Sequence, residues 1–151
     1  ALFSLQTSAQ ENAPSASSVL EKAYAQAKEE NKNVFVKFSA SWCLWCHKLD
    51  QHMKSDACKE YFDANYVTVT LIVRESKNKI HLENAGAFDL LKKHKAENTG
   101  IPFWLIFDSN GKLLADAFNE NGNTVGCPGS KNDINYFIKV LKDLSHIRVF
   151  R

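Results

Sequence analysis

Two periods of hydrophobic and polar residues run along this chain, and together they predict helices interleaved with strands. The longer segments carry apolar residues at the spacing of a helix with one buried face. These predicted helices cover residues 18–31, 43–53, 55–65, 85–95 and 131–145. Shorter segments rich in β-branched and aromatic residues are typical of strands. These predicted strands cover residues 34–38, 66–73, 103–107 and 112–118.

Capping and turn residues set the expected boundaries. Ser18 and Glu21 form a capping-box pattern at the start of the first helix, and Ser130 caps the last one. The polar residues 74–83 are expected to form a loop, and residues 108–111 predict a tight turn between two antiparallel strands. The side chains expected to be buried on the last two helices are Phe88, Leu90, Leu91, Ile134, Phe137, Ile138 and Leu141. The pattern predicts an α/β fold in which helices cover both faces of a central mixed sheet.

The composition is that of one ordinary globular domain. Of the 151 residues, 44% are hydrophobic and 24% are charged, which is close to the average for soluble proteins. The formal net charge of +2 comes from 19 basic and 17 acidic residues, so the chain lacks the strong positive field of a nucleic-acid-binding protein. No apolar run approaches the roughly 18 residues of a membrane span. We therefore expect a monomer that neither binds nucleic acid nor crosses a membrane.

The N-terminal residues are similar to the end of a secretory signal peptide. An apolar start is followed by Thr7 and Ala9, which would stand at positions −3 and −1 of a cleavage site. We therefore expect residues 1–9 to be a signal-peptide remnant, residues 10–17 a linker and residues 18–151 the folded domain. The expected location is periplasmic or secreted. The alternative is an unstructured terminus unrelated to export, because no basic segment precedes the apolar one.

Two of the four cysteines stand where a predicted strand passes into a helix, in the sequence Cys43-Leu44-Trp45-Cys46. At a helix N-terminus, unpaired backbone N–H groups and the helix dipole favour a thiolate, so we expect Cys43 to have a lowered pKa. The spacer places Cys46 one turn away, within bonding reach of Cys43. Such a pair can alternate between dithiol and disulfide. Cys43 would attack a substrate disulfide, Cys46 would resolve the mixed disulfide, and no external cofactor would be needed.

The surrounding residues resemble the thioredoxin superfamily. The segment 38–46 is similar to the active-site segment of that family, Thr99-Gly100-Ile101-Pro102 to its proline loop, and residues 108–113 to its terminal hairpin. The resemblance covers residues 18–145 in the right order. Within the superfamily, the chain is most similar to secreted bacterial thioredoxin-like disulfide reductases.

This resemblance implies a thioredoxin-like fold and a set of substrate-binding residues. It implies a cis bond before Pro102, an Ile101 backbone that pairs with an extended substrate, and a Trp42 side chain beside the site. Trp45 and Phe103 are further candidates for an apolar docking surface. The implied partners are protein or peptide thiols and disulfides, together with a membrane-linked electron donor, since a reductase in an oxidising compartment needs one.

The leading functional hypothesis is therefore a thiol–disulfide oxidoreductase that reduces protein disulfides outside the cytoplasm. A disulfide oxidase or isomerase would use the same pair of cysteines. The competing class is a non-catalytic binding or chaperone-like module in which the disulfide is structural.

Three further residues are candidate modulators. Lys37 stands where thioredoxin has a buried Asp that helps to move the proton of the resolving cysteine; it either favours the Cys46 thiolate or extends its ammonium group to solvent. His47, on the first turn of the helix, could tune the titration of the pair. Cys127 is either a third thiol near the site or a packing residue. A disulfide between Cys127 and Cys58 stays open in an oxidising compartment.

The sequence disfavours two kinds of metal site, a haem and a zinc ion. Residues 43–47 formally match the covalent haem-attachment pattern, but the preceding strand and the Pro102 motif do not suit a cytochrome. For zinc, Cys58 and Cys127 do not form a second CxxC, and His52 lies six residues beyond Cys46, which is a poor ligand spacing. We expect no metal.

Overall fold

The computed structural model describes residues 11–145, so the expected signal-peptide remnant at residues 1–9 lies outside the described part of the chain. The α-helices are α1 (Ala16–Glu30), α2 (Leu44–Met53), α3 (Asp56–Asn65), α4 (Ala87–Lys93) and α5 (Lys131–Ser145), and a 3-10 helix, η1, covers Lys77–Leu82. The strands are β1 (Asn33–Ser39), β2 (Tyr66–Ile72), β3 (Phe103–Phe107) and β4 (Leu113–Asp116).

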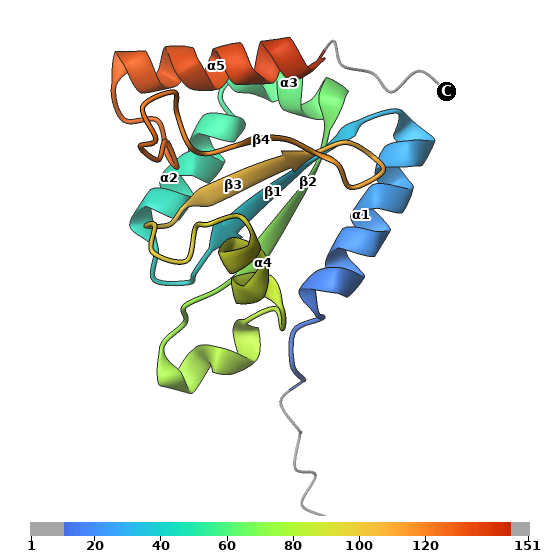
Figure 1. The fold of residues 1–151 in the computed structure, drawn as a ribbon, viewed down its shortest axis with the longest axis vertical. Helices are drawn as coiled ribbons and strands as arrows, with labels where there is room; N and C mark the ends of the chain where they lie inside the picture. The colour runs from blue at the N-terminus through green and yellow to red at the C-terminus, as the bar shows by residue number, and fades with distance from the viewer. Residues whose placement is uncertain (1–10, 146–151) are drawn as a thin grey trace, which may run out of the picture.

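The strands form one mixed sheet in the order β2-β1-β3-β4. Strand β1 runs parallel to β2 and antiparallel to β3, and β3 pairs with β4 as an antiparallel hairpin. All seven residues of β1 are buried, as expected of a central strand. Helices lie on both sides of the sheet (Figure 1). The predicted α/β class, mixed sheet and covering helices are confirmed.

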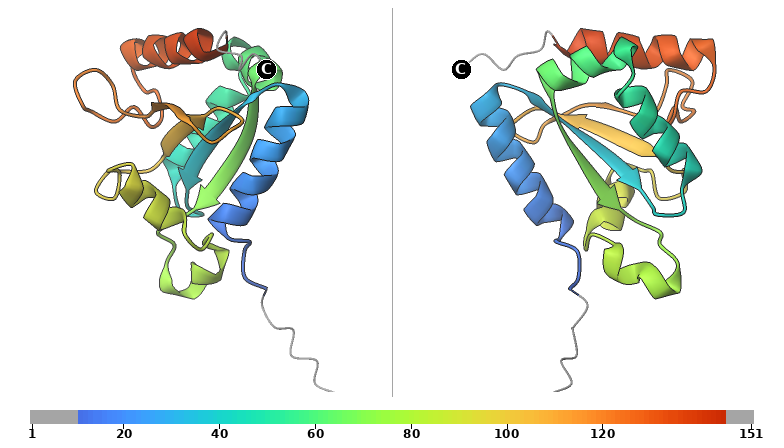
Figure 2. Two further views of the ribbon diagram at one scale, coloured as in Figure 1. Left: turned by 45° about the vertical axis from the view of Figure 1, so that its right-hand side comes forward. Right: turned by 180° about the vertical axis from the view of Figure 1, so that it is seen from behind.

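Aromatic side chains join the sheet to the helices on each face. On one face, the Phe35 ring of β1 contacts Phe62 of α3 and Phe137 of α5, with ring centroids 5.0 Å and 6.3 Å apart. On the other face, Phe107 of β3 meets Tyr24 of α1 at 6.1 Å. Figure 2 shows these layers from two further sides. Because successive strand residues point to opposite faces, the side chain of Lys37 lies on the same face as that of Phe35.

The first helix begins earlier than the capping-box pattern predicts. Ser15 is its N-cap, and its hydroxyl accepts a hydrogen bond from the Ser18 backbone N–H at 3.2 Å. Residues 16 and 17, expected in the linker, are therefore helical. The backbone N–H of Ala13 also donates to the carbonyl of His81 at 3.1 Å, so this lead is attached to the domain.

Other elements also differ from the sequence predictions. The predicted loop 74–83 contains η1, which is too short to show an apolar period. Strand β4 ends at Asp116, because its carboxylate accepts the Phe118 N–H and turns the chain. Phe88 and Ile134, expected to be buried, are 39% and 37% exposed. Helix α4 buries Leu91, as expected, together with Ala87.

Among residues 11–145, no helix combines the length and the apolar character that crossing a bilayer requires.

Candidate functional site

The two cysteines of the CxxC sequence lie where β1 passes into α2. Cys43 is the N-cap of α2, and its sulfur accepts the backbone N–H of Cys46 at 3.2 Å. The two residues form a disulfide, with their Cα atoms 5.3 Å apart. Cys43 is 2% exposed and Cys46 is fully buried. After reduction, the same N–H group and the helix dipole would stabilise a thiolate on Cys43.

The proline loop lies directly against this pair. The peptide bond between Ile101 and Pro102 is cis. The carbonyl oxygen of Ile101 is 3.6 Å from Cys43 Sγ, and the Ile101 side chain packs on the small cluster that contains both cysteines. A Cβ added to Gly126 would lie 1.8 Å from the carbonyl oxygen of Pro102, so only glycine fits at this contact. The fold therefore joins segments near residues 43, 101 and 126 at one end of the sheet.

Three large apolar side chains around the disulfide face solvent. Trp42 is 59%, Leu44 64% and Trp45 52% exposed. The Trp42 indole N–H donates to the Arg74 carbonyl at 2.8 Å, and Lys48 Nζ lies 4.0 Å from the centroid of the Trp45 ring. These contacts restrain both indoles while leaving them exposed, which is the condition for an apolar contact surface.

The proposed docking role of Phe103 was wrong. Phe103 is completely buried, and its ring packs against that of Phe38 of β1, with ring centroids 6.3 Å apart.

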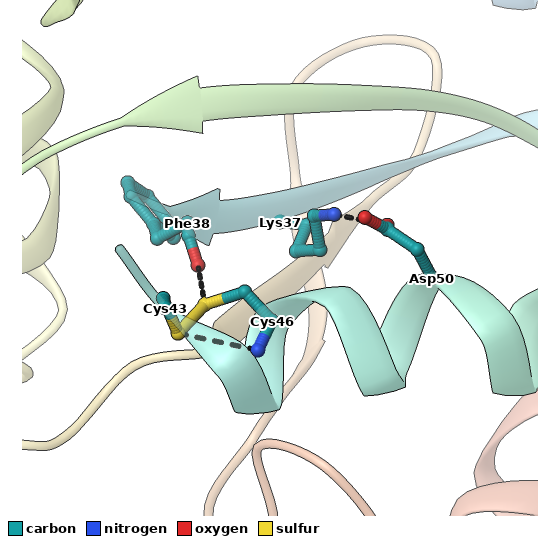
Figure 3. A network of polar contacts seen from close by, with 5 residues as sticks. All are labelled: Lys37, Phe38, Cys43, Cys46 and Asp50. Carbon is teal, nitrogen blue, oxygen red and sulfur yellow. Dashed lines mark hydrogen bonds and ion pairs between the residues drawn. A yellow bond between two sulfur atoms is a disulfide. The ribbon is translucent and has the colours of Figure 1, made fainter. Parts of the chain in front are cut away.

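Lys37 of β1 is buried and forms an ion pair with Asp50 of α2 (Figure 3). Its side chain is 3% exposed, whereas that of Asp50 is 40% exposed. Asp50 stands one turn after Cys46 on α2, and Cys46 Sγ lies 4.0 Å from the Phe38 carbonyl oxygen. A cavity of about 500 Å³ borders both Lys37 and Asp50. The ammonium group therefore stays inside the protein with a carboxylate partner, instead of extending to solvent.

The other cysteines are free thiols. Cys58 is buried on α3, and Cys127 is half-buried beside Gly126. Burial raises the pKa of both thiols; for Cys127 the nearby Lys48 charge opposes part of this rise. The disulfide between Cys58 and Cys127 that the sequence left open is not formed. Neither thiol has the environment of an activated nucleophile.

His47 follows the pair on the exposed side of α2. Its Nε2 atom lies 3.5 Å from the Ser41 carbonyl oxygen. Across the described range 11–145, no group of three or more His, Cys, Asp and Glu side chains could hold a metal ion.

Arg74 and Glu75 also contact the site, although the sequence placed them in a featureless loop. The Glu75 carboxylate accepts the Ser41 backbone N–H at 2.5 Å and the Ser41 hydroxyl at 2.8 Å. The carbonyl oxygen of Arg74 accepts a hydrogen bond from the Trp42 indole N–H. In the sequence, these two charged residues come directly after a predicted strand, at the end of the sheet where the cysteines lie. That position was the signal that could have indicated their contact with the site.

Comparisons with known proteins agree with this architecture. A family model described as thioredoxin-like matches residues 15–109. A disulphide isomerase from Xylella fastidiosa Temecula1 is 20% identical, with a TM-score of 0.61 over 92% of this chain and 99% of that chain. The DsbH oxidoreductase is 21% identical, with a TM-score of 0.50 over 94% and 95%. The reduced DsbD C-terminal domain from Neisseria meningitidis is 16% identical, with a TM-score of 0.51 over 87% and 98%.

At these identities, the solved structures establish a shared fold. No curated protein matches the sequence significantly.

Proposed function

The chain belongs to the thioredoxin-like family, and we propose that it is a thiol–disulfide oxidoreductase that reduces protein disulfides outside the cytoplasm. The observation that carries the proposal is the position of Cys43 at the N-terminus of α2, where its sulfur accepts the Cys46 N–H. This contact supports a nucleophilic thiolate at Cys43 and a resolving thiol at Cys46.

The reaction begins from the reduced dithiol. The Cys43 thiolate attacks one sulfur of a substrate disulfide, which forms a mixed disulfide and releases the other substrate sulfur as a thiolate. Cys46 then loses its proton and attacks Cys43 Sγ, so that the Cys43–Cys46 disulfide forms and the second substrate sulfur leaves. Two electrons pass to the substrate, whose sulfurs end as two thiols. A membrane-linked donor of electrons would then reduce the pair again.

Substrate binding is assigned to the surface around Cys43. An extended substrate segment would pair with the backbone of Ile101, whose carbonyl oxygen is 3.6 Å from Cys43 Sγ. Pro102 sets the course of that loop. The exposed Trp42 and Trp45 rings would cover apolar substrate residues and exclude water from the reacting sulfurs.

The candidate modulators lie on different elements: Lys37 on β1, His47 on α2 and Cys127 in the loop before α5. Cys46 is buried, and the Lys37 ammonium, whose partner Asp50 stands one turn after Cys46 on α2, would supply a buried positive charge that favours the Cys46 thiolate. Asp50 balances that charge but is partly hydrated, which weakens its opposing effect. We assign His47 to the loop before Cys43, because its Nε2 atom lies 3.5 Å from the Ser41 carbonyl oxygen. We assign Cys127 to packing beside the proline loop, because burial raises its pKa.

The reducing direction and the extracytoplasmic location rest on two sequence arguments. The resemblance to secreted reductases supports the direction, and the pattern of residues 1–9 supports export. The reduction potential of the pair would test the direction. A reduction potential of about −270 mV is typical of a reductase, whereas one of about −120 mV would indicate an oxidase.

Reduction of insulin by dithiothreitol tests the activity itself. We expect the wild type to accelerate insulin reduction and Cys43→Ser to lose this acceleration. Cys58→Ala is the matched control, because it removes a buried thiol from α3 without touching the pair. Equal rates for the wild type and Cys43→Ser would refute the enzymatic proposal and favour a binding module with a structural disulfide.

A further inference from the structure

The chain takes an unusual backbone conformation at Arg74, just after β2. The φ angle of Arg74 is 56°, in the left-handed region. A residue with a Cβ atom rarely adopts this conformation, and it persists only where surrounding contacts hold it. Hydrogen bonds from both the side chain and the carbonyl group of Arg74 hold this conformation.

Those contacts join two loops of the site. The two terminal nitrogens of the Arg74 guanidinium donate to the carbonyl oxygens of Thr99 and Glu97, each at 2.7 Å. The Arg74 carbonyl accepts the Trp42 indole N–H at 2.8 Å. Arg74 thus bonds the residue before Cys43 and the turn that leads to Pro102.

The guanidinium is well suited to this task. Its planar fork presents fixed donors that can reach two carbonyl oxygens at once, which a lysine ammonium group does not reproduce. The guanidinium carbon also lies 5.7 Å from the centroid of the Phe88 ring, which supports it from α4.

Glu75 anchors the same segment from the other side. Its carboxylate holds Ser41, and its own backbone N–H donates to the Glu83 carboxylate at 2.8 Å. Residues 74 and 75 are therefore tied both to the loop before Cys43 and to the chain around η1. The guanidinium hydrogen bonds of Arg74 connect this anchored segment to the turn that leads to the proline loop.

We propose that Arg74 is a positioning residue that holds the turn at residues 97–99, and with it the proline loop, in register with Cys43. The inference rests on the proposed function, since that register matters for a substrate whose backbone pairs with Ile101. A polypeptide disulfide would then reach Cys43 in the correct orientation, and reaction rates fall steeply when such an orientation is lost. A small disulfide that reaches Cys43 directly from solvent would not need the loop.

Two substitutions separate the guanidinium from the backbone. Arg74→Gly removes the fork, while glycine accepts the positive φ and keeps the carbonyl available to Trp42. Arg74→Lys keeps the charge but loses the paired geometry. Lys92→Ala is the control. The Nζ atom of Lys92 lies 5.2 Å from the centroid of the same Phe88 ring, so this variant also removes a cation from that ring.

The first measurement does not depend on activity. Amide hydrogen exchange across residues 97–101 is expected to rise about tenfold in Arg74→Gly, because the turn opens more often. Lys92→Ala should exchange like the wild type. Unchanged exchange in Arg74→Gly would overturn the inference, whatever the protein catalyses.

The second measurement compares two substrates of the reduced protein. For insulin, kcat/KM should fall about tenfold in Arg74→Gly, with Arg74→Lys closer to Arg74→Gly than to the wild type. For 5,5′-dithiobis(2-nitrobenzoate), kcat/KM should stay within about twofold of the wild type. Equal losses on both substrates would overturn a role in substrate positioning. If the wild type reduces neither substrate faster than Cys43→Ser, the proposed function fails instead, and the exchange result still decides whether Arg74 holds the loop.

Discussion

The ion pair between Lys37 and Asp50 is unevenly buried, and this unevenness predicts an unequal response to mutation. The Lys37 side chain is 3% exposed and the Asp50 side chain 40% exposed. Asp50→Ala leaves an ammonium group inside the protein without its partner. Lys37→Met leaves a carboxylate that water already reaches, and it fills the buried space with an apolar chain of similar length.

The expected magnitudes follow from these exposures. Removing one partner of a buried pair costs about 3–5 kcal/mol. We expect Asp50→Ala to lower the free energy of unfolding by about 3 kcal/mol, the low end of this range, because the cavity beside the pair gives the ammonium group some access to water. Lys37→Met should change the free energy of unfolding by only about 0–1 kcal/mol, since replacing a buried charge by a well-packed apolar side chain is often neutral.

Urea unfolding and thermal unfolding of the oxidised protein at neutral pH measure both effects, as a free energy and as a Tm. With a shift of roughly 3 °C per kcal/mol for a chain of this size, Asp50→Ala should lower Tm by about 9 °C and Lys37→Met by less than about 3 °C. The double variant Lys37→Met/Asp50→Ala should recover most of the loss, because the unpaired ammonium group is gone. Equal destabilisation by the two single substitutions, or a double variant no more stable than Asp50→Ala, would refute the reasoning.

The remaining predictions concern the free thiols and the contact at Gly126. Unfolded protein without reductant should yield two alkylated thiols per chain, and reduced protein four, because Cys43 and Cys46 are bridged and Cys58 and Cys127 are free; four thiols without reductant would contradict the disulfide. Burial raises the pKa of Cys127, so its alkylation by iodoacetamide in the native protein should be slower than that of an ordinary thiol at pH 8 and should accelerate as the pH rises; a rate equal to that of a free model thiol would contradict this. Gly126→Ala would place a methyl group 1.8 Å from the Pro102 carbonyl oxygen and should lower the free energy of unfolding by about 1–3 kcal/mol. Gly129→Ala is the matched control, since nothing lies within 4 Å of its added Cβ, and equal Tm values for the two variants would contradict the close contact.

The parts of this fold that follow from the sequence are those whose structure depends on neighbouring residues. The apolar strand before Cys43 and the helix after it follow from residue pattern and helix periodicity. The same local rules failed at Phe88, because its apolar character says nothing about which side of α4 meets the core. The prediction for Phe103 was wrong in the opposite sense. Its position next to Pro102 in the sequence does not reveal that its ring is buried in the core.

The residue pattern of this chain is sufficient to predict an α/β domain and a cysteine pair at a strand-to-helix junction. Both depend on residues within a few positions of one another, whose backbone preferences act locally. In contrast, the pairing of Lys37 with Asp50 and the hydrogen bond from Arg74 to the loop before Pro102 arise from tertiary packing. These contacts join residues 13 and 25 positions apart. Their geometry depends on how α2 packs on the sheet and on where the chain emerges from β2, which no local pattern contains.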